Sequence, residues 1–195
     1  MTVSAPPKVR NAAATRANIL RAARDSFGKQ AYEQVGLREI GADAGIDAAL
    51  ICRYFGSKEE LFAEALASTG KEPMQTLGGD RATFGDRVAR TMLVPDDQTT
   101  EQNLAFINLA IRSAASPVAH RLVRRHVEEC FIVPFAAWLG GEDGEARARL
   151  VASVLLGVAI VRGVLFSPLE VSEDEEAAIA RLARVLQDII DADEG

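Results

Sequence analysis

The chain of 195 residues is 48% hydrophobic and 26% charged, so it can form one compact domain, or a small domain joined to a larger one, around a substantial apolar core. Its two cysteines are too few for a disulfide framework, and residues 1–11 contain no apolar stretch, so we expect no signal peptide and a cytoplasmic location. The net charge of −6 is uneven: residues 1–60 carry nine Lys and Arg against seven Asp and Glu, a net +2, whereas residues 61–195 carry 13 against 21, a net −8.

The hydrophobic pattern predicts helices throughout. Alternation of apolar and polar residues does not persist anywhere, so we expect an all-α fold. Residues 1–13 contain two adjacent prolines followed by basic and small residues, which indicates a flexible arm. From Thr15, a candidate N-cap, an amphipathic helix is predicted to about Gln30. Its apolar face consists of Ile19, Ala23 and Phe27.

Residues 37–62, LREIGADAGIDAALICRYFGSKEELF, contain two short helical segments separated by a glycine turn and followed by a third helix. Two helices that cross steeply through a turn of about three to four residues bring their backbones close together at one point. Gly41 is the small residue expected at that point, and Gly45 can adopt the positive φ that ends the first helix. This spacing is typical of a helix-turn-helix that reads DNA.

The second helix of this pair has two dissimilar faces. At about 100° per residue, Leu50, Ile51 and Tyr54 fall on one side. The opposite side consists of Ala48, Ala49, Cys52 and Arg53. A face with so little bulk can enter a major groove about 12 Å wide, so we interpret this segment as the recognition helix. The alternative is an ordinary solvated helix in an all-helical domain.

The third helix begins with a capping box, S-x-x-E, at residues 57–60. In such a box Ser57 accepts a hydrogen bond from the amide of Glu60, and Glu60 reaches back to the amide of Ser57. Lys58 then lies at a helix N-terminus, where the backbone amides attract phosphate. The basic excess of residues 1–60 fits a DNA-facing head on an acidic body.

Beyond residue 68 we predict further helices over residues 81–94, 101–115, 117–139, 145–166 and 173–191. Residues 95–97 are expected to form a loop, Ser116-Pro117 an N-cap with proline at the first helical position, and residues 172–175 a second capping box. Pro134 is expected to kink or split its helix. The apolar stretch at 150–166 contains Arg162 and is short for a membrane span, so a buried helix is favoured.

These residues resemble the TetR (tetracycline repressor) family of bacterial transcriptional regulators, which join an N-terminal three-helix DNA-binding domain to a helical ligand-binding and dimerising domain. The resemblance is carried by Phe27-Gly28, by LREIGADAGI and by RYFGSKEELF, and covers residues 15–65 closely. It implies an arm at residues 1–13, a helix-turn-helix domain at 14–68 and an effector-binding and dimerisation domain at 69–195.

The resemblance also implies roles for single residues in DNA binding. Arg38 matches an arginine that reaches a base edge or a phosphate. The base-facing positions correspond to Ala48, Ala49 and Cys52, with Arg53 adjacent, and the phosphate contacts to Tyr54 and Lys58. The chain departs from the family at Cys52, where Tyr is usual, at Asp47, where Ser or Thr usually caps, and at Gly36, where Thr often caps. Asp47 can still cap.

Because the recognition face is otherwise made of small residues, Arg38 and Arg53 are expected to carry most of the sequence specificity. For Arg38 the alternative is an ion pair on the helix surface with Asp43 or Glu39.

A single recognition helix covers too few bases, so we expect a homodimer on a palindromic double-stranded DNA operator. The last two helices supply the predicted interface: Leu150, Val154, Gly157, Val161, Leu165, Ile179, Leu182 and Leu186. The alternative is that these stripes complete the core of a monomer. The ligand pocket that the resemblance implies is assigned to Phe84, Met92, Phe106, Arg112, His126, Phe131, Phe135 and Trp138.

We therefore predict a dimeric DNA-binding transcriptional regulator, a repressor released from its operator by a small-molecule effector. The chain contains neither a phosphate-cradling glycine motif nor a nucleophile with a plausible base, so we expect no enzyme, no cofactor and no membrane partner. His126 and Cys130 are four residues apart, but two ligands do not make a metal site. The alternative function is a helical protein-binding adaptor that keeps the fold without specific DNA binding.

Overall fold

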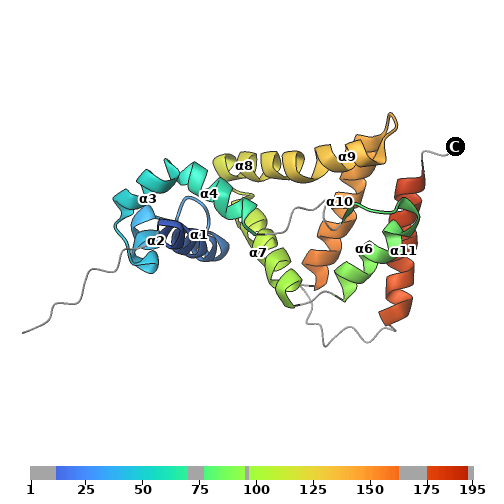
Figure 1. The fold of residues 1–195 in the computed structure, drawn as a ribbon, viewed down its shortest axis with the longest axis horizontal. Coiled ribbons are helices and arrows are strands. Elements are labelled where there is room, and N and C mark those ends of the chain that lie inside the picture. The colour runs from blue at the N-terminus through green and yellow to red at the C-terminus, as the bar shows by residue number, and fades with distance from the viewer. Residues whose placement is uncertain (1–11, 70–76, 95–96, 163–174, 193–195) are drawn as a thin grey trace, which may run out of the picture.

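The computed structural model describes residues 12–69, 77–94, 97–162 and 175–192, with the side chains of α7 described from residue 105 onward. Within these ranges all regular structure is helical, which confirms the predicted all-α fold (Figure 1). The predicted arm at residues 1–13 is described only for its last two residues, and the capping box predicted at residues 172–175 lies outside the described ranges except for Glu175.

Four helices form the head of the molecule: α1 (Ala12–Lys29), α2 (Leu37–Ala44), α3 (Ala48–Phe55) and α4 (Lys58–Ala67). Helix α1 packs against α2 and α4, so its apolar face covers the helix-turn-helix as predicted. Thr15 is not the N-cap of α1, because it lies inside the helix and is buried. The helix begins earlier since residues 12–14 are alanines, the strongest helix formers.

The body follows from residue 77. Its elements are η1 (Arg81–Thr83), α6 (Phe84–Leu93), α7 (Asp97–Ser113), α8 (Pro117–Val127), the π-helix η2 (Glu128–Ile132), α9 (Val133–Leu139), α10 (Gly144–Ile160) and α11 (Glu175–Asp191). Asp97, predicted in a loop, is instead the first residue of α7. Ser116 caps α8 as predicted, since its Oγ accepts from the amide of Ala119 at 3.2 Å.

Pro134 splits the helix predicted over residues 117–139, and it does so through η2. Proline lacks an N–H for the carbonyl four residues back, and its ring clashes with that carbonyl. Immediately before Pro134 the chain takes the wider π-form, in which the amide of Val133 donates to the carbonyl of Glu128, five residues earlier. Helix α9 then continues with Pro134 in its first turn. Figure 1 shows α8 and α9 running along one edge of the molecule, from the head to the body.

Two hydrophobic cores lie at the two ends of this edge. The head core contains apolar side chains of α1 to α4, and it also includes Leu109 of α7 and Ala119 of α8. The body core is formed by α6, α9, α10 and α11, with Phe84, Phe135 and Leu186 fully buried. Helices α7 and α8 therefore belong to the head as much as to the body, although the sequence places them in the second domain.

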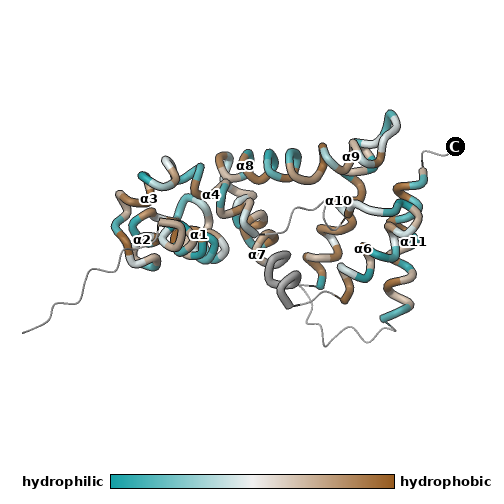
Figure 2. The backbone as a smooth tube through the Cα atoms, viewed as in Figure 1, coloured by the Kyte–Doolittle hydropathy of each residue, from teal (hydrophilic) through white to brown (hydrophobic). Residues whose placement is uncertain are grey.

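Helix α10 is apolar along much of its length (Figure 2). The sequence predicts a buried helix here, but one part of α10 is exposed. Val151 is buried in the body core, whereas Leu150 and Leu156 of the same helix and its C-cap Val161 are exposed. Within the described ranges, no helix combines the length and the apolar character that crossing a bilayer requires.

Two arginines fix the C-terminal ends of α9 and α11. The guanidinium of Arg147 is buried and donates to the carbonyls of Ile190 at 2.9 Å and Gly140 at 2.7 Å, and to the carboxylate of Asp143 at 2.7 Å. Arg81 donates to the carbonyls of Leu139 at 2.9 Å and Ile190 at 2.5 Å. The last carbonyls of a helix have no partner within it, so these side chains satisfy groups that burial would otherwise leave unpaired.

We expect Arg147→Ala to lower the free energy of unfolding by about 1–3 kcal/mol, because it removes the donor to the Gly140 carbonyl and one of the two arginine donors to the Ile190 carbonyl. Urea denaturation measures this loss. Arg149→Ala is the matched control: Arg149 lies two residues further along α10, is half-exposed, and among the described residues its guanidinium bonds to the carboxylates of Glu145 and Glu128. The control should unfold at nearly the wild-type midpoint, and an equal shift in both variants would contradict the role assigned to Arg147.

Candidate nucleic-acid interface

The angle between α2 and α3 is fixed by a close approach of their backbones at Gly41. A Cβ added to Gly41 would lie 2.9 Å from the carbonyl oxygen of Ile46 and 3.2 Å from the amide nitrogen of Ala48. Gly45 ends α2 in the left-handed conformation, with φ 67° and ψ 37°, and the amide of Ile46 donates to the carbonyl of Gly41 at 2.9 Å. The turn predicted from the two glycines is confirmed.

Helix α3 begins at the cap predicted for it. The carboxylate of Asp47 accepts a hydrogen bond from the amide of Ala49 at 2.7 Å, which satisfies one of the free amides of the first turn. Gly36, the N-cap of α2, makes no side-chain capping bond, as its lack of a side chain requires.

The two faces of α3 divide as the sequence predicts. On the inner side Ile51 is fully buried, and Leu50 and Tyr54 are partly buried. Phe55, which the sequence argument did not single out, joins them in the head core. On the outer side Ala49, Cys52 and Arg53 are exposed, while Ala48 is half-buried because its backbone lies against Gly41.

Two arginines stand free on this surface. Arg38 on α2 and Arg53 on α3 are both exposed, and among the described residues neither takes part in an ion pair. The alternative for Arg38 was an ion pair with Asp43 or Glu39. The carboxylate of Glu39 instead accepts a hydrogen bond from Gln30 at 2.6 Å. Both guanidinium groups therefore keep their donors available to a ligand.

The capping box before α4 is half formed. The Oγ of Ser57 accepts from the amide of Glu60 at 3.1 Å, as predicted. The reciprocal bond is not made, because the turn at Gly56, with φ 83°, directs the Ser57 amide to the carbonyl of Phe55 at 3.1 Å. The N-terminus of α4 is thus capped by the Ser57 side chain.

Lys58, the first residue of α4, is partly buried against an aromatic ring. Its Nζ lies 4.4 Å from the centroid of the Tyr32 ring. Burial lowers the pKa of Lys58, and the nearby Glu33 and Glu59 oppose that shift. Burial, followed by Glu59 and Glu33, raises the pKa of Tyr32 to about 12. The sequence argument missed Tyr32, although an aromatic residue in the polar connection QAYEQVG is a signal that could have found it.

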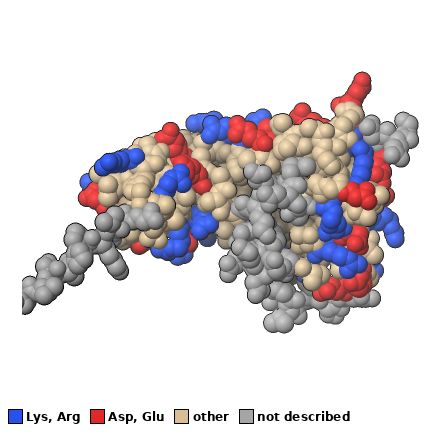
Figure 3. All heavy atoms as spheres, in the orientation of Figure 1, with Lys and Arg blue, Asp and Glu red and all other residues tan. Residues whose placement is uncertain are grey.

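Arg16 of α1 holds the third and fourth helices together. Its guanidinium pairs with the carboxylate of Glu64 on α4 and lies 4.8 Å from the ring centroid of Phe55 at the end of α3. Arg24, also on α1, donates to the carbonyl of Ser68 at 3.0 Å. These basic residues of α1 are engaged within the head. On the face shown in Figure 3, basic and acidic side chains are interspersed over the head and do not form one continuous basic surface.

Family models match both parts of the chain. The model described as "Bacterial regulatory proteins, tetR family" matches residues 19–65, and the model described as "Tetracyclin repressor-like, C-terminal domain" matches residues 82–190. The chain belongs to the TetR family. Its helix-turn-helix is thus the DNA-binding element of a transcriptional regulator, as the resemblance implied. The comparison with curated proteins gave no match.

Solved structures of TetR regulators share the fold. A TetR-family regulator from Streptomyces coelicolor A3 is 29% identical, with a TM-score of 0.59, over 97% of this chain and 99% of its own. GusR of Salmonella enterica is 17% identical, with a TM-score of 0.73, over 94% and 99%. NalD, a secondary repressor of the MexAB-OprM multidrug efflux pump in Pseudomonas aeruginosa, is 18% identical, with a TM-score of 0.68, over 89% and 97%.

The aromatic residues predicted to line a pocket in this TetR body pack on one another. Phe84 and Phe135 are fully buried, with ring centroids 5.5 Å apart, and the centroids of Trp138 and Phe131 lie 5.4 and 5.6 Å from that of Phe135. Met92 is partly buried against the same core. Phe84 and Phe135 thus lie in the body core, and the other three side chains pack against it.

The other three predicted pocket residues lie on α7 and α8: Phe106 and Arg112 on α7, and His126 near the C-terminal end of α8. The ring of Phe106 is 6.2 Å from that of His126, whose pKa is lowered by burial against the opposing effect of Glu129. Arg112 is exposed near the end of α7. Cys130 lies 3.6 Å from Nδ1 of His126, and the described residues contain no group of three side chains arranged to hold a metal ion.

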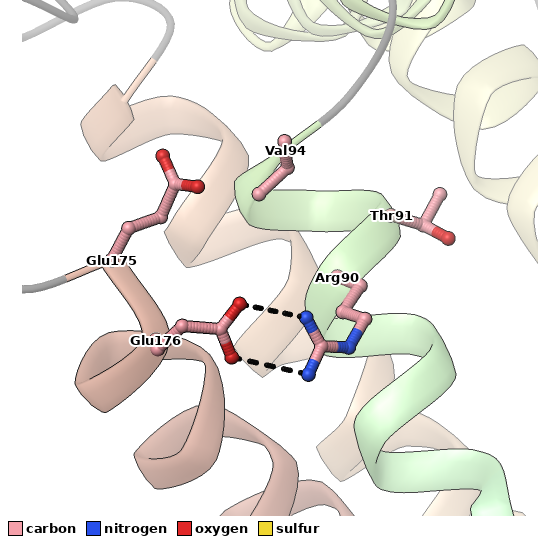
Figure 4. A pocket seen from close by; sticks show the side chains of 5 residues that line it. All are labelled: Arg90, Thr91, Val94, Glu175 and Glu176. Atoms are coloured by element: carbon pink, nitrogen blue, oxygen red, sulfur yellow. Dashed lines mark hydrogen bonds and ion pairs between the residues drawn. The ribbon is translucent and has the colours of Figure 1, made fainter.

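A surface depression lies elsewhere, between α6 and the start of α11 (Figure 4). It is lined by Arg90, Thr91, Val94, Glu175 and Glu176, none of which was predicted. The guanidinium of Arg90 makes two hydrogen bonds to the carboxylate of Glu176, at 3.0 and 3.2 Å. Those bonds and Asp86 raise the pKa of Arg90, so the positive charge of Arg90 is already paired within the protein.

The residues predicted for a dimer interface divide between surface and core. Leu150 and Val161 are exposed, as is Gly157, where an added Cβ would meet open space. Val154 and Leu182 are partly buried. Ile179 and Leu186 are buried within the chain, which is the position expected of residues that complete the core of a monomer. Leu165 lies outside the described residues.

We expect Gly41→Ala to lower the free energy of unfolding by about 1–3 kcal/mol, because the new Cβ would meet the backbone of the turn. Thermal denaturation measures this. Gly36→Ala is the control, since a Cβ there would touch nothing within 4 Å and the effect should stay below about 0.5 kcal/mol. Equal stability of the two variants would show that the close approach at Gly41 does not constrain the head.

Proposed function

We propose that the protein is a dimeric repressor that binds a palindromic operator through α3 and is released from it by a small-molecule effector. The observation that carries the proposal is the outward face of α3, where Ala49, Cys52 and Arg53 are exposed on a helix anchored by Ile51 and Phe55. Its slight bulk suits a groove about 12 Å wide, and the Asp47 cap fixes the end that leads into that groove.

Base recognition in this proposal depends on Arg53 and Arg38. Each guanidinium can make two hydrogen bonds to the O6 and N7 atoms of guanine, and Ala48, Ala49 and Cys52 can contact thymine methyl groups. The absence of ion pairs to Arg38 and Arg53 within the described residues supports this role, because neither arginine has to break a protein contact first. Tyr54 and Lys58 border the same face and are proposed to contact phosphates, together with the free amides of α4.

The second copy is proposed to dock on the exposed side of α10. Leu150 and Gly157 are seven residues apart, and Val161, the C-cap of α10, follows four residues later, so the three share a face. Val185 of α11 is exposed as well. An apolar surface on two neighbouring helices is what an isologous interface buries, and Gly157 permits close approach of two backbones. A twofold dimer places two copies of α3 on successive half-sites.

We propose an arm at residues 1–13, a DNA-binding domain at 14–68 and a body at 69–195. The effector is proposed to bind in the body. Phe106 of α7 and His126 near the end of α8 face each other with ring centroids 6.2 Å apart, and we propose the effector site on this side of α7 and α8. Since α7 and α8 also contribute Leu109 and Ala119 to the head core, a ligand there can bias the position of the head.

We expect Arg53→Ala to reduce affinity for the operator by at least about tenfold, the loss of one bidentate base contact, with the helical content unchanged. The first candidate operator is the DNA that flanks the protein's own gene, and a gel-shift titration measures the affinity of each variant for it. Arg125→Ala, an exposed arginine on α8, serves as the control and should bind normally. Unchanged operator binding by Arg53→Ala would rule out its role, and purely nonspecific retardation of the wild type would favour the protein-binding adaptor.

We expect Leu150→Glu to convert a dimer into a monomer in sedimentation experiments, because a charge would be buried in the proposed interface. Val133→Glu provides the control: Val133 is as exposed as Leu150 but lies on α9, so this variant should remain dimeric. A wild-type protein that sediments as a monomer at micromolar concentration would contradict the interface.

A further inference from the structure

Tyr32 lies in the connection between α1 and α2, yet its ring is held from several sides. The side chain is 6% exposed. Its ring stacks on Phe27 with centroids 5.8 Å apart, and meets Phe62 of α4 edge-on at 5.3 Å. Phe27 and Phe62 are themselves fully buried and lie 5.0 Å apart. Tyr32 is therefore a fixed platform within the head core.

One face of this platform carries the ammonium group of Lys58. The distance of 4.4 Å from Nζ to the ring centroid lies within the reach of about 6 Å over which a cation is attracted by an aromatic face. A lysine side chain is otherwise a flexible stem with a mobile charge. Contact with a ring that cannot move gives this charge a defined position at the first turn of α4.

Two carboxylates compete for the same ammonium group. Glu33 and Glu59 are close enough to act on the pKa values of both Lys58 and Tyr32. Among the described residues, however, neither carboxylate forms an ion pair with Lys58, whose charge lies over the ring. The ring therefore keeps Lys58 available for another anion.

The hydroxyl group of Tyr32 has no part in this arrangement. It is buried and has no hydrogen-bond partner among the described residues. A buried polar group without a partner is unfavourable, so the fold does not depend on it. The useful part of Tyr32 is its ring, and a phenylalanine at this position would supply the same platform.

We propose that Tyr32 is a positioning residue for DNA binding, whose ring holds the Lys58 ammonium at the N-terminus of α4 in the place where it meets a backbone phosphate. The inference rests on the proposed function. The ring occupies one side of the ammonium, and the N–H donors on its other side are free to bind phosphate oxygens. Because Lys58 is already in place, binding does not have to order its side chain.

The test uses the full-length protein and a labelled DNA duplex of random sequence, since phosphate contacts are independent of sequence. Affinity is measured over a range of salt concentrations for the wild type, Tyr32→Phe, Tyr32→Leu, Lys58→Ala and the double variant Tyr32→Leu/Lys58→Ala. Circular dichroism and thermal melting establish that each variant is folded.

We expect Tyr32→Phe to bind like the wild type and Tyr32→Leu to bind about three- to tenfold more weakly. Lys58→Ala should weaken binding and lower the salt slope by about one, the loss of one phosphate contact. In the Lys58→Ala background, Tyr32→Leu should have no further effect, because the ring acts only through Lys58. A merely structural role of Tyr32 would instead weaken binding equally in both backgrounds, and this outcome would overturn the proposal.

If Tyr32→Leu does not fold, the wild type and Tyr32→Phe still decide the question by NMR. Ring currents should move the side-chain methylene signals of Lys58 upfield in both proteins, and unshifted signals would overturn the proposal. Wild-type protein that binds no duplex at all would contradict the proposed function. Wild-type binding that Lys58→Ala weakens but Tyr32→Leu does not would overturn only the role of Tyr32.

Discussion

The contact of two backbones at Gly41 sets the geometry on which the DNA-binding surface depends. Because no Cβ separates Gly41 from Ile46 and Ala48, α2 and α3 cross closely enough for Ile51 and Phe55 to reach the head core. With those anchors in place, the remaining side of α3 can only face solvent. The helix crossing therefore decides which positions of α3 face outward, and the sequence places small residues and one arginine at those positions.

The head is not closed by its own four helices. Leu109 and Ala119, from α7 and α8, are buried in the same core as the helix-turn-helix, whereas Ile132 and Phe135, further along the same helical edge, are buried in the body core. One continuous run of helix thus has its two halves in two cores, with η2 between them. The position of the head therefore depends on helices that also belong to the body. For the same reason, the domain boundary predicted at residue 68 does not separate the two cores.

Local signals account for what could be predicted. The Gly45 turn, the Asp47 and Ser116 caps and the two faces of α3 depend on residues within a few positions of one another, and each was found from the sequence. Contacts between distant parts of the chain could not be predicted in this way. Phe84 lies on α6 whereas Phe135 and Trp138 lie on α9, so the packing of Phe84 on these two rings could not be seen along the chain. The stacking of Lys58 on Tyr32 joins residues 26 positions apart, and no periodicity reveals it.

Both cysteines of the chain are exposed, one in each functional region. Cys52 lies on the outer face of α3 and Cys130 within η2, where the helical edge passes from head to body. The native protein therefore carries two accessible thiols at which spectroscopic probes can be attached without substitution. With Cys52 replaced by serine, a probe at Cys130 alone would report the spacing of the two subunits in the proposed dimer, so that a change of spacing on DNA binding is open to direct distance measurement.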